Sequence, residues 1–236
     1  QEGADYHRTV TRLLNELMME SERLRGRNPE KSLRVSTTVS FASKWLAPRL
    51  SRFRQRYPEF DIQLDVTDSN VDLNDGQVDA AIRYGLGHYR DVSYERIFDE
   101  TVTPVCSPGF LKEHNGLTEI KELSNCVLLH EYRMLANWEA WFEMAGEKKF
   151  CCHHGPLWTL GSMATEAAIR GEGVALGRSV LIADDVAAGR LVVLFPQYKL
   201  KAERGYDLVY RSDNQDSFKI RILRQWLSEE MSLLED

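Results

Sequence analysis

The sequence of 236 residues lacks an excess of positive charge and has no long apolar run. Its formal net charge is −6, whereas a domain that holds nucleic acid by itself usually carries a basic face. No apolar stretch approaches the roughly 18 residues of a membrane span, and the first thirty residues lack the apolar core of a signal peptide. We therefore expect neither DNA binding by this chain alone nor a membrane partner.

Cysteine is also scarce, with four in the chain. Cys151 and Cys152 are adjacent and such pairs rarely bridge, which suits a reducing cytoplasm. Cys106 and Cys126 have apolar neighbours, which favours inert buried thiols over a redox sensor. Because residue 1 is Gln rather than Met, we expect that either a preceding domain or a secretory signal has been removed, and we prefer the cytoplasmic interpretation.

Catalytic and cofactor motifs are missing as well. There is no G-x-S-x-G elbow and no H-E-x-x-H, and His130 beside Glu131 lacks a well-placed nucleophile. The run Cys151–His154 has residue types that bind zinc or copper, but alternate side chains of an extended segment point to opposite sides and cannot easily wrap one ion. The glycines of 171–177 follow a helix and precede a strand, the reverse of a dinucleotide loop. We expect no enzyme, no metal and no cofactor.

What the sequence does contain is an alternation of strand and helix. Leu33–Val39 is rich in β-branched residues, and the next segment has helical spacing until Pro58 stops it. Residues 61–67 alternate between polar and apolar, as in a strand with one buried face, and Val78–Tyr84 is a third strand. Apolar strands separated by helices predict an α/β fold with a mostly parallel sheet covered on both faces.

The rest of the chain repeats this pattern. We predict extended segments at Ile97–Cys106 and Tyr206–Arg211, strands at Cys126–His130, Val174–Leu176 and Leu191–Phe195, and helices at Trp138–Ala145, Met163–Arg170 and 218–234. Two lobes joined by two crossing strands would enclose a cleft, which is a favoured ligand site. The pattern alone does not fix the number of crossings.

The N-terminal segment from Tyr6 to Arg25 lacks Gly and Pro and has a heptad-like apolar stripe. The stripe consists of Val10, Leu13, Leu17 and Leu24, and Glu20 interrupts it. We predict a helix that pairs with another subunit; the alternative is an amphipathic helix packed on its own domain. The polar residues 26–31 then form a hinge.

Three motifs resemble the effector-binding domain of LysR-type transcriptional regulators: S-F-A-S-K-W-L-A-P-R-L, V-D-A-A-I-R-Y-G-L-G and T-P-V-C-S-P. The similarity is to the subgroup of the glycine-cleavage activator and the β-lactamase regulator. It continues through G-P-L-W-T-L-G-S-M-A-T-E-A-A-I-R-G-E-G-V-A-L-G and A-A-G-R-L-V-V-L-F-P, so that it covers nearly all of residues 33–236.

The resemblance implies a periplasmic-binding-protein-like fold of type 2, with two Rossmann-like lobes joined by two crossover strands. It places a linker and dimerisation helix at 1–31, the first lobe at 32–104 and 207–236, and the second lobe at 105–206. It further implies a homodimer or homotetramer that senses a small-molecule effector and reaches DNA through a missing N-terminal winged helix-turn-helix. The alternative is an extracytoplasmic solute-binding protein of the same fold.

Candidate ligand contacts begin at the first strand-to-helix turn, with Val39, Ser40 and Phe41. Free N–H groups at a helix start can hold a polar or anionic ligand, although a serine there can also be a simple N-cap. The resemblance implies that Ser40, Ser69 and Tyr206 contact the effector. The alternatives are a plain turn residue for Ser69 and a buried aromatic for Tyr206.

Two further groups complete the predicted site. Arg83, Tyr84 and Gly85 end the third strand, where the guanidinium could grip a carboxylate with a bidentate fork or form a structural ion pair. Ser162 and Met163 begin a second helix whose N-terminus would face the same cleft. Two such helix starts favour an anionic or zwitterionic small molecule.

Overall fold

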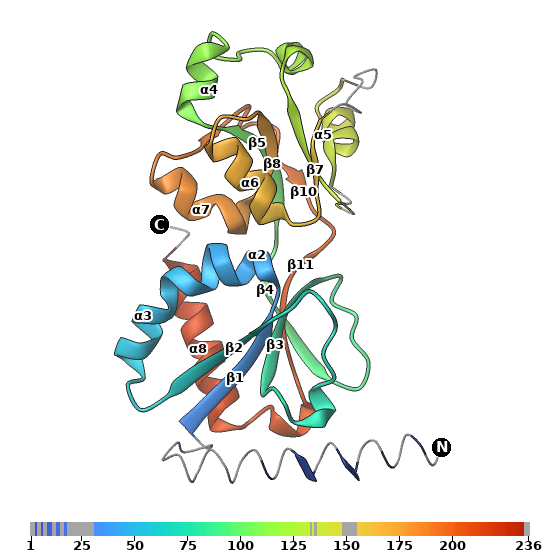
Figure 1. Cartoon of the computed structure of the whole chain (residues 1–236), viewed down its shortest axis with the longest axis vertical. Coiled ribbons are helices and arrows are strands. Elements are labelled where there is room, and N and C mark those ends of the chain that lie inside the picture. The colour runs from blue at the N-terminus through green and yellow to red at the C-terminus, as the bar shows by residue number, and fades with distance from the viewer. Residues whose placement is uncertain are drawn as a thin grey trace. The chain divides into compact units, whose positions relative to one another are not determined.

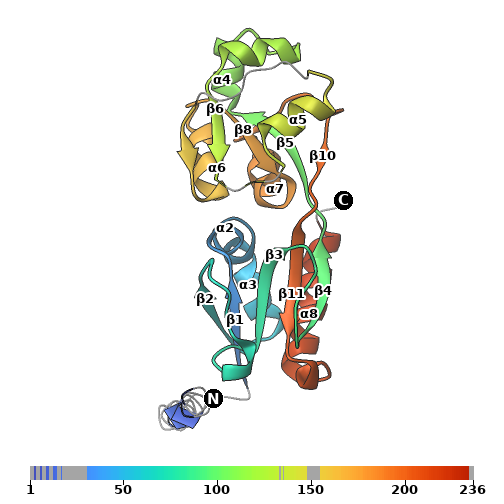
Figure 2. The same cartoon turned by 90° about the vertical axis from the view of Figure 1, so that its right-hand side faces the viewer.

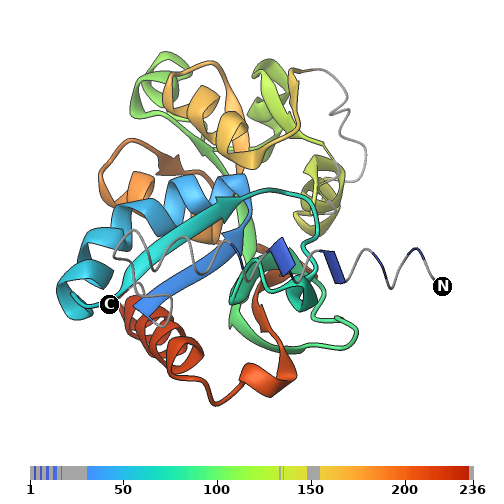
Figure 3. The ribbon, with the colours of Figure 1, turned by 60° about the horizontal axis from the view of Figure 1, so that its bottom comes forward.

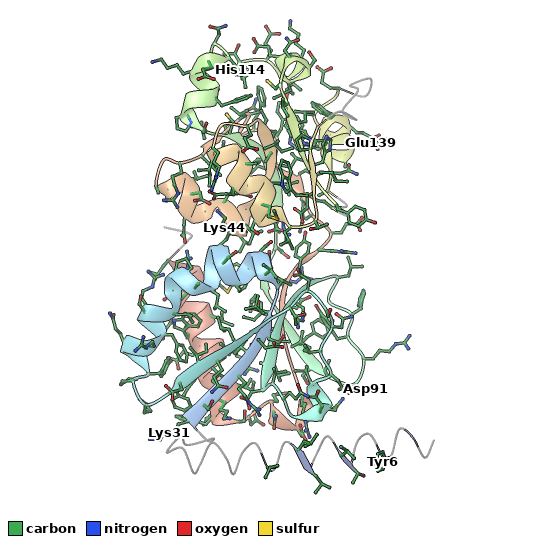
Figure 4. The ribbon with its side chains drawn as sticks, in the orientation of Figure 1. Tyr6, Lys31, Lys44, Asp91, His114 and Glu139 are labelled. Carbon is green, nitrogen blue, oxygen red and sulfur yellow. The ribbon has the colours of Figure 1, made fainter. Side chains whose placement is uncertain are left out.

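The computed structural model describes residues 31–132, 134, 136–147 and 155–233, together with seven positions near the N-terminus. These seven are Gly3, Tyr6, Thr9, Val10, Leu13, Leu14 and Leu17, and all are helical. The prediction of a helix before the domain is therefore confirmed, whereas Glu20, Leu24 and Cys151–His154 lie outside the described residues. The side chain of Leu17 is 64% exposed, and that of Tyr6 is also exposed (Figure 4).

The chain divides into two compact units. Unit 1 consists of Gln1–Thr38, Pro48–Ile97 and Tyr206–Asp236, and unit 2 consists of Val39–Ala47 and Phe98–Gly205. Each unit is built around its own sheet with helices packed against it (Figure 1). The predicted α/β class is confirmed.

The sheet of unit 1 has five strands. They are β1 (Ser32–Thr37), β2 (Asp61–Val66), β3 (Ala80–Gly85), β4 (Ser93–Phe98) and β11 (Gly205–Tyr210), in the order β2-β1-β3-β11-β4 (Figure 2). Strand β1 runs parallel to both β2 and β3. Helices α3 (Ala47–Arg56) and α8 (Phe218–Ser232) pack together through the rings of Phe53 and Trp226, whose centroids are 5.1 Å apart.

The sheet of unit 2 is mixed. Its strands are β5 (Thr101–Cys106), β6 (Leu128–Glu131), β7 (Leu157–Trp158), β8 (Val174–Arg178), β9 (Val192–Val193) and β10 (Leu200–Lys201). The order is β10-β5-β8-β6-β7, with β9 also on β5. Strand β6 is parallel to β7 and β8, but β5 is antiparallel to β8, so the expected parallel arrangement fails at β5. Its helices are α4 (Pro108–Glu113), α5 (Trp138–Met144), α6 (Gly161–Ile169) and α7 (Ser179–Ala187).

A helical segment follows β1 and changes pitch before Pro48. Helix α2 (Val39–Phe41) leads into a π-helical turn, Ala42–Leu46, where the N–H of Ala47 donates to the carbonyl of Ala42, and then into α3 (Figure 3). Proline lacks an N–H, and in a regular α-helix its ring clashes with the carbonyl four residues earlier. A widened turn relieves such a clash, so Pro48 explains the pitch.

Three of the differences between the predicted and the observed strands and helices have a clear local reason. The predicted extended segment Ile97–Cys106 is two strands in different sheets, because the chain breaks at Asp99 and Glu100. Sequence analysis missed α4, which Ser107 caps and Pro108 starts, a common helix N-terminus. It also missed α7, whose S-V-L-I-A start is apolar and partly β-branched, as in a buried strand. Among the described residues, no helix has the length and apolarity that crossing a bilayer requires.

Candidate functional site

The structure brings Ser40 and Ser162 together in unit 2. Helix α6 begins after Leu160, whose side chain has no oxygen to accept from the first free N–H groups. Ser40 supplies this oxygen from a distant part of the chain: its Oγ accepts from the backbone N–H of Ser162 and donates to the Ser162 Oγ, each at 3.2 Å. The hydroxyl of the buried Ser40 therefore caps α6, and it lies in a polar contact rather than in apolar packing.

The other residues predicted around these two serines differ in their exposure. Phe41 is fully buried and stacks on Trp45, with ring centroids 4.9 Å apart, so a ligand could meet its backbone but not its side chain. Val39 offers its carbonyl to the Ser43 hydroxyl at 3.0 Å. Met163 is 48% exposed on the first turn of α6.

A carboxylate that sequence analysis had set aside, that of Glu131, lies at the same helix start. Glu131 ends β6, and a Cβ added to Gly161 would lie 2.5 Å from its Oε2. Arg178 contacts Glu131 at 3.4 Å and Glu100 at 2.9 Å. The side chain of Glu131 is 15% exposed. A negative group at the N-terminus of a helix is favourable, and parallel strands place such groups at their carboxyl ends.

Arg83 holds the strands of unit 1 together at their carboxyl ends. Its Nη1 donates to the carbonyl of Thr67 at 2.9 Å, and its Nη2 donates to the Ser36 hydroxyl at 2.7 Å. Burial lowers the pKa of the guanidinium, and the negative charges of Asp65 and Asp68 act in the opposite direction. Arg83 therefore has structural partners on β1 and after β2, and its predicted contact with a ligand stays a prediction.

Gly85 lies against a second polar group of unit 1. A Cβ at Gly85 would lie 2.5 Å from the Tyr89 hydroxyl, which donates to the fully buried Asp207 at 2.9 Å. Arg96 donates to the same carboxylate at 2.5 Å. Burial and the hydrogen bond to Asp207 raise the pKa of Tyr89. Sequence analysis missed Asp207, although it follows the predicted contact Tyr206.

The other predicted contacts of unit 1 are an aromatic pair and a turn. The ring centroids of Tyr84 and Tyr206 are 5.2 Å apart, and Tyr206 is fully buried. This placement agrees with the alternative in which Tyr206 is a buried aromatic residue. Ser69 is exposed, and its N–H donates to the Thr67 hydroxyl at 3.2 Å. This geometry is that of a local turn and leaves the Ser69 side chain at the surface.

The described cysteines are reduced. Cys106 is buried, and burial raises the pKa of its thiol to about 11. Burial also raises the pKa of Cys126. Thiols with raised pKa values are poor nucleophiles at neutral pH. Within the described ranges, no three His, Cys, Asp or Glu side chains gather as metal ligands.

Two α/β units with hydroxyls and charged groups at the carboxyl ends of their parallel strands define a small-molecule-binding domain of the periplasmic-binding-protein-like class. Comparisons with known proteins are more specific. The family model of the LysR substrate binding domain matches residues 26–232, and the chain therefore belongs to this family.

Individual proteins similar to this chain are also LysR-type regulators. The glycine cleavage system transcriptional activator of Escherichia coli K12 is 32% identical over 227 residues, which are 96% of this chain and 74% of the relative. The transcriptional activator AmpR of Rhodobacter capsulatus is 31% identical over 88% of this chain and 69% of the relative. The effector domain of AmpR from Pseudomonas aeruginosa superposes with a TM-score of 0.71 and 26% identity, covering 86% of this chain and 96% of that one.

The chain is thus the effector-sensing domain of a LysR-type transcriptional regulator. These relatives are regulators, so the alternative of an extracytoplasmic solute-binding protein is wrong. They also confirm the expectation that the protein is not an enzyme.

Proposed function

We propose that an anionic or zwitterionic effector binds at the start of α6 and displaces the contact between Ser40 and Ser162. The observation that supports this most is the Ser40 hydroxyl, which accepts the Ser162 N–H at 3.2 Å. A carboxylate oxygen accepts from the same N–H more strongly, because a charged acceptor at a helix start also gains from the helix dipole. The effector then replaces one cap with a better one.

The displaced hydroxyls become ligand contacts. Ser40 and Ser162 each carry a donor proton and can turn toward a bound carboxylate. Ser40 is attached to α2, so the exchange changes what holds α2 against α6. Coupling to transcription requires that the effector bind one arrangement better than the other, because equal affinities shift no equilibrium.

The remaining parts of the regulator follow from the family. The exposed apolar residues Leu13 and Leu17 on the N-terminal helix support pairing with a second copy, in a homodimer or homotetramer. DNA is reached through an N-terminal winged helix-turn-helix domain, in agreement with the acidic charge of this chain. The regulator works in the cytoplasm, where its DNA lies.

A calorimetric titration tests the proposed site. Amino acids, small carboxylic acids and neutral sugars are first screened by their effect on the melting temperature, and the compound with the largest shift is titrated into the wild type, Ser40→Ala and Ser162→Ala. We expect a carboxylate to give this shift. Each substitution removes a hydroxyl that would donate to the bound carboxylate, and it also removes part of the Ser40–Ser162 contact that the effector must displace. The net effect should be a roughly threefold to tenfold loss of affinity.

Ser124→Ala is the matched control, because Ser124 is exposed in unit 2 and donates locally to the Lys121 carbonyl at 2.7 Å. It should bind like the wild type. Unchanged affinity in both Ser40→Ala and Ser162→Ala would remove the proposed site.

A further inference from the structure

A small cavity lies in unit 2 beside the start of α6. Its lining includes His130 and Glu131 of β6, Asn137 and Trp138 at the start of α5, and Ala164 of α6. Its volume is about 20 Å³, and a cavity needs roughly 10–15 Å³ to hold one water. The cavity therefore admits one group of the size of water and no ring.

The cavity adjoins the proposed effector site through Glu131. The Glu131 carboxylate lies so close to Gly161 that a Cβ there would be 2.5 Å from its Oε2. Gly161 directly precedes Ser162, whose N–H and hydroxyl meet Ser40. A carboxylate and a pair of hydroxyls thus lie at one helix start, within the reach of a compact molecule that carries opposite charges.

We infer that this cavity receives the primary ammonium group of a zwitterionic effector, with Glu131 as its acceptor. The inference rests on the proposed function, in which the effector's carboxylate meets Ser40 and Ser162. An ammonium is a compact charge with three donors, close in size to water. The carboxylate of Glu131, which also contacts Arg178 at 3.4 Å, attracts the ammonium directly. A trimethylammonium group is too large for the volume.

Selectivity for the amine is the property to measure. The L-amino acid that binds most tightly in a panel of the common ones is compared by calorimetry with its des-amino acid and its N,N,N-trimethyl derivative. The wild type should prefer the primary amine over both by roughly tenfold to a hundredfold, the value of a hydrogen bond between charged groups. Glu131→Gln should lose this preference while its affinity for the des-amino acid stays the same.

Two further variants separate charge from space. Glu139→Gln removes the same charge from an exposed position on the neighbouring helix α5 (Figure 4), and it should keep the wild-type preference. Ala164→Val fills the cavity without changing its charge and should weaken binding of the amine but not of the des-amino acid. A thermal melt of each variant confirms that it is folded.

The possible outcomes distinguish the two proposals. Equal binding of the amine and the des-amino acid by the wild type, or failure of every amino acid in the panel to bind, overturns the inference and leaves the cavity as a water site. An amine preference that survives Glu131→Gln also overturns it. The proposed function fails separately if both Ser40→Ala and Ser162→Ala bind the amine and the des-amino acid as tightly as the wild type does.

Discussion

Replacing Arg83 with methionine should destabilise unit 1, because the guanidinium donates hydrogen bonds to two acceptors on other segments of the sheet. The Thr67 carbonyl and the Ser36 hydroxyl lie 2.9 and 2.7 Å from its two terminal nitrogens. Hydrogen bonds to a charged group contribute about 1.5–3 kcal/mol each. Methionine avoids the cost of burying a charge, the same burial that lowers the pKa of Arg83. The net loss should be about 2–4 kcal/mol.

Denaturation in urea and a thermal melt measure this loss. For a chain of this size about 1 kcal/mol corresponds to roughly 2–4 °C, so Arg83→Met should lower the melting temperature by roughly 4–16 °C. Arg83→Lys should fall between it and the wild type, because a single ammonium does not reproduce the planar fork. Arg54→Met on the exposed face of α3 is the control and should change stability by at most about 0.5 kcal/mol.

The reasoning is refuted if Arg83→Met is as stable as the wild type. If that variant also loses affinity for the effector, the guanidinium is a ligand contact, as the fork interpretation of the sequence has it. A loss of both stability and affinity would assign Arg83 both functions.

Two further predictions concern unit 1 and unit 2 in turn. Burial and the bond to Asp207 raise the pKa of Tyr89, so the folded state keeps a phenol proton that the unfolded chain loses above about pH 10, and stability falls as the pH rises through that range. Tyr89→Phe should make this fall shallower in urea titrations at alkaline pH, and an identical slope would contradict the assignment. In unit 2, a Cβ at Gly173 would lie 2.4 Å from the Val127 carbonyl oxygen, whereas the nearest atom to one at Gly109 is 3.9 Å away. Gly173→Ala should therefore cost about 1–3 kcal/mol and Gly109→Ala less than about 1 kcal/mol; equal melting temperatures would contradict this packing argument.

Much of the fold can be predicted from local pattern. The β-branched run at Leu33 corresponds to β1, and the alternation of polar and apolar residues after Asp61 corresponds to β2. Both signals lie within the strand itself, so they can be read without knowledge of the fold. Helix α7 could not be predicted in the same way, since its apolar first turn has no capping residue and Arg178 precedes it. Its helical form depends on packing against β8 and the turn before α3.

The residues of the candidate site also divide into those with a local sequence signal and those whose place depends on the fold. Ser40 could be singled out because a hydroxyl at a strand-to-helix turn is a local signal, and Ser162 because it begins a second predicted helix. The hydrogen bonds between the two serines depend on the fold. Glu131 could not be singled out, because its place depends on the missing side chain of Gly161, thirty residues further along the chain. Asp207 is similar: its partners Tyr89 and Arg96 come from a different part of the sequence.

The backbone amide of Ser162 offers the most direct measurement of the proposed mechanism. Its N–H is bound to the Ser40 hydroxyl at 3.2 Å, and the proposal requires an effector carboxylate to take over this bond. In an NMR titration with the tightest-binding carboxylate, the Ser162 amide resonance should move with the same dissociation constant as calorimetry gives. A resonance that stays in place while the effector saturates the protein would contradict the account.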